Sequence, residues 1–146
     1  MGIFASAPLL PILLSMVGME MASIETSPEI LVVEDEAASR RALTLLLKMN
    51  GYTAAAVGSA EEALLAFERQ PWPGVALVDL DLPGMSGLEL ISRLQSLGAK
   101  VHAVLITAAD ADRVRQTSRG RAVVYMQKPL NFETLLKLLH ERLGHD

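Results

Sequence analysis

Cysteine is absent from the 146 residues of the chain. Its absence excludes a disulfide-stabilised scaffold and any metal site built on thiolates. It also fits a reducing compartment, and we therefore expect a cytoplasmic protein. A strong positive charge is missing as well, because the formal net charge is -4. The surface as a whole does not attract phosphate backbones, so direct binding to nucleic acid is not expected.

Motifs that cradle nucleotides or hold zinc are also missing. The sequence has neither a GxGxxG stretch nor a P-loop, which argues against a nucleotide-binding protein. The histidines at positions 102, 140 and 145 lack the spacing of metal ligands, and we interpret them as structural or surface residues.

The first part of the chain contains no basic residue before Arg40. A secretory signal needs a basic start, so the apolar run Ile3–Met19 does not fit that pattern. The run is also short for a membrane span and is broken by two prolines and a glycine, so membrane insertion is not expected. We predict that residues 1–28 are an apolar extension, either disordered or upstream of the true start. A packing arm, a tether and a cryptic signal are the alternatives.

The rest of the chain has the composition of one folded domain. Half of all residues are hydrophobic and 21% are charged, which is typical of a compact globular protein. This length suffices to bury one substantial core. We therefore predict a single domain over residues 29–146.

Signals for strands and helices alternate along this domain. Short apolar runs between turn residues predict strands, and Ser59 with Glu62 has the spacing of a capping box that begins a helix. The predicted strands cover residues 30–33, 53–57, 75–78, 101–106 and 122–126. The predicted helices cover residues 37–49, 59 to just before 71, 86–97, 110–119 and 131–143. Apolar strands alternating with helices predict a doubly wound α/β fold, with a five-stranded parallel sheet covered on both faces.

Reactive side chains follow four of these strands. In a doubly wound sheet, function is found outside the carboxyl ends of the strands. The residues at these ends are Glu34 and Asp35, Asp79, Thr107, and Lys128. Residues far apart in the sequence are therefore expected to meet in one pocket.

The residue types in this pocket suit phosphoryl transfer. Clustered carboxylates repel one another unless a cation compensates them, and Mg²⁺ prefers oxygen ligands. The Asp79 carboxylate is the candidate nucleophile, since a carboxylate can accept a phosphoryl group. Lys128 supplies an ammonium that neutralises the transferring oxygens, and the Thr107 hydroxyl can hydrogen-bond a phosphoryl oxygen.

Taken singly, each of these residues has an ordinary structural explanation. An acidic residue after a strand, such as Asp35, is commonly a helix N-cap. Asp79 and Asp81 read as loop carboxylates, Thr107 as a strand residue, and Lys128 as a solvated surface charge. Their shared position at strand ends favours one common site.

Four stretches of sequence resemble the receiver domain of bacterial two-component response regulators. They read ILVVEDE at 30–36, LVDLDLPGMSGLEL at 77–90, LITA at 105–108 and YMQKP at 125–129. The resemblance implies a flavodoxin-like (βα)5 fold with strand order 2-1-3-4-5.

The resemblance also implies a role for each matching residue. Asp79 would be the phosphoacceptor. The Mg²⁺ ligands would be Asp35, Asp79 and the backbone carbonyl of Asp81, with Glu34 acting through water. Lys128 would bond the phosphoryl group, and its peptide bond to Pro129 would be cis.

A paired switch is the further implication of this family. The hydroxyl of Thr107 would be drawn to the phosphoryl group while Tyr125 rotates inward. Phosphorylation would thereby shift the population between two packings of this face.

The resemblance names the kinds of partner to expect. A sensor histidine kinase or a histidine phosphotransfer protein would donate the phosphoryl group to this stand-alone regulator, which would be a phosphoacceptor rather than an enzyme. A downstream protein would read the switch, with an acidic partner suggested by a basic patch of Arg113, Arg115, Arg119 and Arg121. A phosphorylation-dependent homodimer is a further expectation.

Two other functions compete with this interpretation. Asp79-Leu80-Asp81 resembles the nucleophile motif of haloacid-dehalogenase-like phosphatases, although those enzymes carry it on their first strand. A receiver-like interaction module that is never phosphorylated is the other alternative, and the intact set of acidic, hydroxyl and lysine side chains argues against it.

Overall fold

The computed structural model describes residues 28–69, 72–119 and 123–144. Almost all of the predicted N-terminal extension lies outside these residues. Within the described part of the chain, no helix is both long enough and apolar enough to cross a membrane.

The described residues form the predicted alternation of strands and helices. The strands are β1 (Ile30–Val33), β2 (Ala54–Val57), β3 (Val75–Asp79), β4 (His102–Thr107) and β5 (Tyr125–Gln127). The helices are α3 (Ala37–Met49), α4 (Ala60–Ala66), α5 (Gly87–Ser96), α6 (Ala111–Ser118) and α7 (Phe132–Leu143). All strand pairs are parallel and the order is β2-β1-β3-β4-β5, which confirms the expected flavodoxin-like topology.

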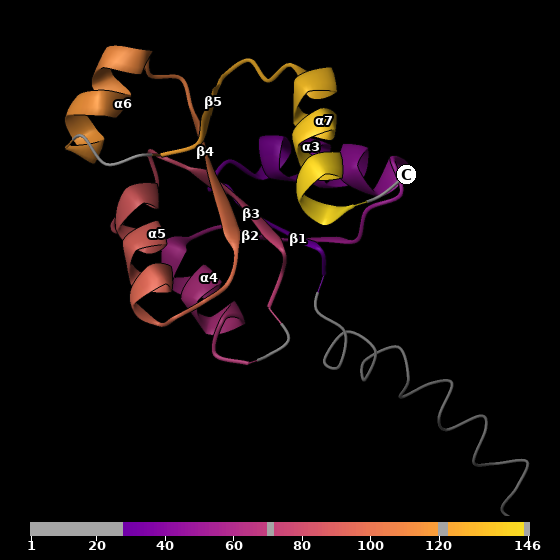
Figure 1. The fold of residues 1–146 in the computed structure, drawn as a ribbon, viewed down its shortest axis with the longest axis horizontal. Coiled ribbons are helices and arrows are strands. Elements are labelled where there is room, and N and C mark those ends of the chain that lie inside the picture. The colour runs from indigo at the N-terminus through magenta and orange to yellow at the C-terminus, as the bar shows by residue number, and fades with distance from the viewer. Residues whose placement is uncertain (1–27, 70–71, 120–122, 145–146) are drawn as a thin grey trace, which may run out of the picture.

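Helices cover both faces of the sheet, with α3 and α7 on one face and α4, α5 and α6 on the other (Figure 1). The alternation of side chains along β1 produces the two layers, because successive residues of a strand point to opposite faces. Ile30 and Val32 belong to the core beneath α3 and α7. Leu31 and Val33 belong to the core beneath α4 and α5. All four residues of this strand are buried, as expected for a central parallel strand.

Most boundaries lie within one residue of the sequence prediction, and two differ from it by several residues. β5 begins at Tyr125 rather than near residue 122, because its ladder pairs only with the last half of β4, from Leu105 onward. Helix α4 ends at Ala66, several residues before the prolines that were expected to end it. The indole of Trp72 donates a hydrogen bond to the carbonyl of Phe67, the residue that caps this helix.

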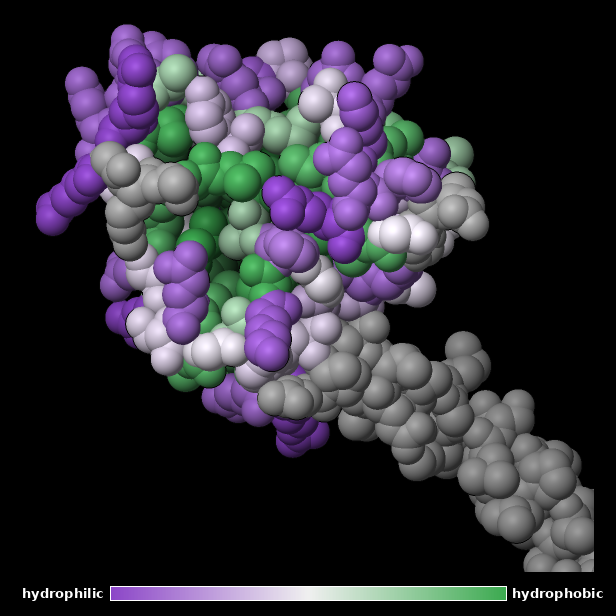
Figure 2. Space-filling model, viewed as in Figure 1, coloured by the Kyte–Doolittle hydropathy of each residue, from purple (hydrophilic) through white to green (hydrophobic). Residues whose placement is uncertain are grey.

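A third, smaller cluster lies between α5, α6 and β4. It contains Leu80, Leu88, Leu105, Ala109 and Val114. Helix α6 itself buries only Val114 and Ser118. Apolar side chains are visible at the surface of the molecule in Figure 2. A cavity of about 240 Å³ is lined by residues of α5, of β4 and of the segment just before β5. Helix α6 is therefore held to the domain by few apolar contacts.

Candidate functional site

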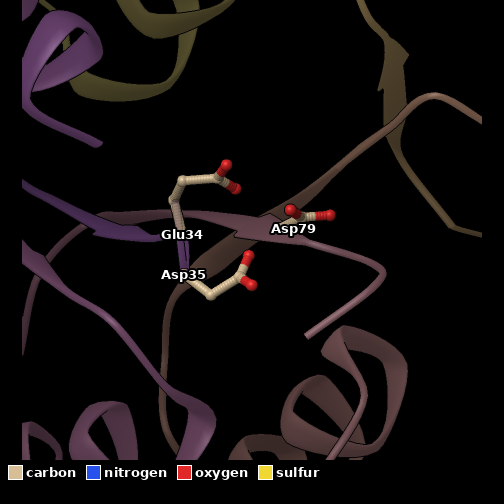
Figure 3. A group of neighbouring side chains, drawn as sticks. All are labelled: Glu34, Asp35 and Asp79. Atoms are coloured by element: carbon tan, nitrogen blue, oxygen red, sulfur yellow. The ribbon is translucent and has the colours of Figure 1, made fainter. Parts of the chain in front are cut away.

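Three carboxylates meet at the carboxyl ends of β1 and β3 (Figure 3). Glu34 and Asp35 directly follow β1, and Asp79 is the last residue of β3. One oxygen of each carboxylate lies within 4.8 Å of the other two. Glu34 and Asp79 are buried, whereas Asp35 is exposed. The fold therefore brings together the acidic residues that the sequence placed at neighbouring strand ends.

Lys128 provides the cation that faces this cluster. It directly follows β5, and its Nζ lies 3.3 Å from Oδ2 of Asp79 and 3.6 Å from Oε1 of Glu34. Burial alone would lower the pKa of Lys128, but attraction to Asp79 and Glu34 outweighs it and the pKa is raised. Lys128 is thus held as an ammonium. Its peptide bond to Pro129 is cis, as the resemblance implied.

The two buried carboxyl groups differ in their affinity for a proton. Burial, a hydrogen bond to Asp79 and repulsion from Asp79 raise the pKa of Glu34 to about 7. Burial also favours a protonated Asp79, but hydrogen bonds from Glu34 and the Asp81 backbone, together with Lys128, leave its pKa below the ordinary value. Asp79 is therefore the group of the pair that ionises first, and Glu34 keeps its proton to a higher pH.

These observations test whether a divalent cation fits the site. Among the described residues, Lys128 forms the ion pairs of this cluster, with Glu34 and Asp79. Burial, and then repulsion from Asp79 and Asp35, still raise the pKa of Glu34, so the negative charge of the cluster is not fully compensated. Closely spaced carboxylate oxygens are the ligand type that Mg²⁺ binds. The donor set therefore fits a magnesium ion.

The loop after β3 orients the nucleophile candidate. The backbone N–H of Asp81 donates a 3.0 Å hydrogen bond to Oδ1 of Asp79. Gly87, the first residue of α5, packs so tightly that a Cβ atom there would lie 2.3 Å from the backbone oxygen of Asp79. Glycine is the residue that permits this approach, because any side chain would displace the Asp79 backbone.

The hydroxyl side chain of Thr107 is completely buried at the end of β4. Its Oγ1 accepts a 2.9 Å hydrogen bond from the backbone N–H of Ala109. A hydroxyl that accepts one hydrogen bond can still donate its own proton. In addition, the N–H of Lys128 donates to the Thr107 carbonyl at 2.7 Å, which connects the ends of β4 and β5. Thr107 thus lies at the same end of the sheet as Asp79 and Lys128.

Tyr125 lies three residues before Lys128, at the start of β5. Its side chain is at the surface, with 36% of its area exposed. It pairs in register with Leu105, two residues before Thr107 on the neighbouring strand. The structure thus places the two predicted switch residues on adjacent strands, with Tyr125 outward.

The predicted basic patch is partly neutralised within the chain. Arg113 pairs with Asp81 at 2.9 Å, and Arg115 pairs with Asp112 of its own helix. Arg119 follows α6 in a left-handed conformation with φ of 54°, and Arg121 lies outside the described residues. The pairing of Arg113 with Asp81 joins residues 32 positions apart, and no local sequence pattern indicated it.

An apolar cavity that the sequence did not reveal opens beside the acidic cluster. Its volume is about 310 Å³, and Glu34, Asp79 and Lys128 form part of its wall. The rest of the wall comes mainly from apolar residues of α3 and of the segment that leads into α7, including Leu43, Leu46, Pro129, Leu130 and Phe132. The Asp79 carboxylate is therefore bordered by a mainly apolar wall.

Of the three histidines, His102 and His140 are exposed, and His145 lies outside the described residues. The group of potential metal ligands found in the described part of the chain contains no histidine.

The chain belongs to the response regulator receiver domain family, whose sequence profile matches residues 30–140. The two-component response regulator PhoP of Pseudomonas aeruginosa is 41% identical over 109 residues. That stretch is 73% of this chain and 48% of the relative, so the chain spans about half the length of that protein.

Solved structures show the same architecture. A receiver domain from Methanospirillum hungatei has a TM-score of 0.70 and 28% identity, over 82% of this chain and 95% of that one. A response regulator from Thermotoga maritima, solved in complex with Mg²⁺-BeF, has a TM-score of 0.67 and 30% identity, over 77% of this chain and 96% of that one. Family membership decides against a haloacid-dehalogenase-like phosphatase, in agreement with the position of Asp79 on the third strand rather than the first.

Proposed function

We propose that this chain is a phosphorylation-controlled switch in which Asp79 accepts a phosphoryl group from a phosphohistidine. Receiver domains receive phosphoryl groups from histidine kinases, and a histidine phosphotransfer protein offers the same donor chemistry. The observation that carries the proposal is the buried, ionised Asp79 carboxylate, 3.3 Å from the Lys128 ammonium and adjacent to two further carboxyl groups.

The transfer exchanges one bond to phosphorus for another. An oxygen of the Asp79 carboxylate forms the new P–O bond while the P–N bond to the donor imidazole breaks, and the nitrogen leaves with the electron pair. Asp79 suits this role because the hydrogen bond from the Asp81 N–H fixes one carboxylate oxygen at 3.0 Å. Lys128 neutralises charge on the phosphoryl oxygens, and such preorganised charge accounts for most of the catalysis in phosphoryl transfer. Later hydrolysis of the aspartyl phosphate restores the carboxylate.

A divalent cation completes the charge balance. Asp35, Asp79 and the backbone carbonyl of Asp81 would hold Mg²⁺, with Glu34 contributing through water. When bound, the ion supplies positive charge that stabilises the phosphoryl oxygens. The Mg²⁺-BeF complex of the Thermotoga maritima relative supports this assignment.

The donor has to present its imidazole at the mouth of the site. The apolar wall formed by Leu43, Leu46 and Pro129 borders Asp79 and offers a contact surface for that protein. Leu46 is 42% exposed, so part of this wall is open to contact from outside the chain.

The output of the switch would come from Thr107 and Tyr125. The Thr107 hydroxyl would donate to an arriving phosphoryl oxygen while Tyr125, now outward, rotates inward and changes the surface around β5. Residues 29–146 would form this receiver unit in the cytoplasm. A downstream protein, or a second copy of the chain, would read the altered face, with the arginines of and after α6 favouring an acidic partner.

Intact-mass analysis after incubation with acetyl phosphate and Mg²⁺ tests the proposal. We expect a gain of one phosphoryl group that requires Mg²⁺ and is lost in Asp79→Asn. An Asp112→Asn variant, which changes an exposed carboxylate of α6, should gain the same mass as the wild type. No gain in the wild type, with Mg²⁺ binding shown separately, would replace this proposal by that of an unphosphorylated interaction module.

A further inference from the structure

The side chain of Arg113 links α6 to the loop that follows the nucleophile. Its guanidinium lies 2.9 Å from Oδ1 of Asp81. Among the ion pairs of the described residues, this is the one that connects α6 to a residue outside the helix. The two side chains are 56% and 50% exposed, so solvent weakens their attraction. The contact is therefore easily exchanged for a stronger one.

A short series of contacts leads from this pair to the nucleophile. The backbone N–H of Asp81 donates to Oδ1 of Asp79, while the side chain of Asp81 accepts from Arg113. One residue thus separates the guanidinium from the carboxylate proposed to carry the phosphoryl group. The start of α6 is tethered near the same point a second time, because the Ala109 N–H donates to Oγ1 of Thr107.

Phosphorylation would change the charges around Arg113. An aspartyl phosphate replaces a carboxylate by a phosphoryl group with roughly two negative charges and three acceptor oxygens. A guanidinium forms stronger and more specific hydrogen bonds to such a group than to one exposed carboxylate. Relying on the function proposed above, we propose that Arg113 leaves Asp81 and binds a phosphoryl oxygen on Asp79, drawing the start of α6 toward the site.

The packing of α6 permits this movement. The helix buries only Val114 and Ser118, and the N–H of Arg113 caps its first turn by donating to the Asp110 side chain. The opening turn of α6 can therefore shift without breaking a large apolar interface. Arg113 would act as a positioning residue that reports the phosphoryl group to the helix, in addition to Thr107.

Hydrogen exchange of the α6 amides tests this inference. The wild type, Arg113→Gln and Arg113→Lys are compared with and without beryllofluoride and Mg²⁺. Arg115→Gln is the matched control, because Arg115 is on the same helix but pairs within it. We expect loading to slow exchange of these amides several-fold in the wild type and in Arg115→Gln. The slowing should be absent in Arg113→Gln and partial in Arg113→Lys, while the unloaded proteins exchange alike.

NMR of the arginine Nε–H groups gives a direct signal. The resonance of Arg113 is assigned as the one that disappears in Arg113→Gln. Its resonance should shift on loading, whereas that of Arg115 should not. Intact mass with acetyl phosphate is measured on the same samples. A normal mass gain with equal α6 protection in Arg113→Gln and the wild type would overturn this inference alone. A wild-type protein that gains no mass would overturn the proposed function, and this inference with it.

Discussion

Nζ of Lys128 lies 3.3 Å from Oδ2 of Asp79, although the two residues are 49 positions apart. The contact exists because β3 and β5 both end at the same edge of the sheet, on either side of β4. An ammonium held at this point counteracts the burial that would otherwise favour a neutral Asp79. The Lys128–Asp79 contact therefore results from the order of the strands in the sheet and not from residues that are close in the sequence.

Replacing Lys128 by alanine should slow phosphorylation of Asp79. The change removes the fixed positive charge that faces the transferring oxygens, and losses on the order of 10²-fold follow the removal of one such group. The rate of mass gain with acetyl phosphate provides the measurement. Lys100→Ala, which removes an exposed ammonium away from the site, should react at the wild-type rate. If Lys128→Ala gained mass as fast as Lys100→Ala, the role given to Lys128 would be contradicted.

Glu34 should make the metal-free protein less stable as the pH rises from about 4.5 to about 7. The pKa of Glu34 is about 7 in the folded protein against 4.5 ordinarily. Within this window the unfolded chain loses the proton that the folded chain keeps, so ionisation favours unfolding. Above about pH 7 both states are ionised and the effect levels off. The lowered pKa of Asp79 acts in the opposite sense, but at lower pH, below its ordinary value of 3.8.

Urea unfolding at pH 5 and pH 7.5, followed by fluorescence of the single tryptophan, Trp72, measures this slope. Glu34→Gln should flatten it, because the amide does not titrate. Glu133→Gln, an exposed glutamate of α7, should retain it. A wild-type slope in Glu34→Gln would assign the pH dependence to another group.

Asp35→Asn should weaken stabilisation by Mg²⁺. A ligand that binds only the folded state at 100 times its Kd stabilises by about 2.7 kcal/mol, and a tenfold loss of affinity removes about 1.4 kcal/mol. The shift of the urea midpoint with increasing Mg²⁺ provides the measurement. Asp112→Asn should shift like the wild type. If Asp35→Asn did so too, Asp35 would not belong to the metal site.

Gly87→Ala should destabilise the fold by about 1–3 kcal/mol, the usual cost of overpacking a tight contact. The added Cβ would lie 2.3 Å from the backbone oxygen of Asp79, so either α5 or the end of β3 must move. Gln95→Ala, at an exposed position of the same helix, should unfold at the wild-type midpoint. A Gly87→Ala variant as stable as the wild type would show that α5 can shift freely.

The elements and the gathering of the site were predictable because their causes are local or topological. Ser59 accepts a hydrogen bond from the N–H group three residues later, as its capping box predicted, and Ser86 accepts the same kind of bond at the start of α5. Strand ends meet once the strand order is known, so Glu34, Asp79 and Lys128 converge as expected.

What the sequence could not predict depends on side chains that meet only in the folded chain. Arg113 pairs with the distant Asp81, whereas Arg115 pairs with Asp112 in its own helix. Both are arginine–aspartate pairs, so residue type alone does not predict which aspartate each arginine contacts. The apolar cavity beside Asp79 depends on how α3 and α7 approach the sheet. Likewise, the start of β5 depends on where β4 offers it a partner.

Thr107→Val should destabilise the protein although the two side chains have nearly the same shape. Valine cannot accept the hydrogen bond from the Ala109 N–H, and an unpaired buried donor costs about 1–3 kcal/mol. Thr107→Ser keeps the acceptor and should lose less, so the urea midpoints of the two variants separate the hydroxyl from the methyl group. The same bond ties the end of β4 to the approach to α6. Wild-type stability in Thr107→Val would therefore mean that the bond contributes nothing to folding, and would leave Arg113 as the stronger link between the site and α6.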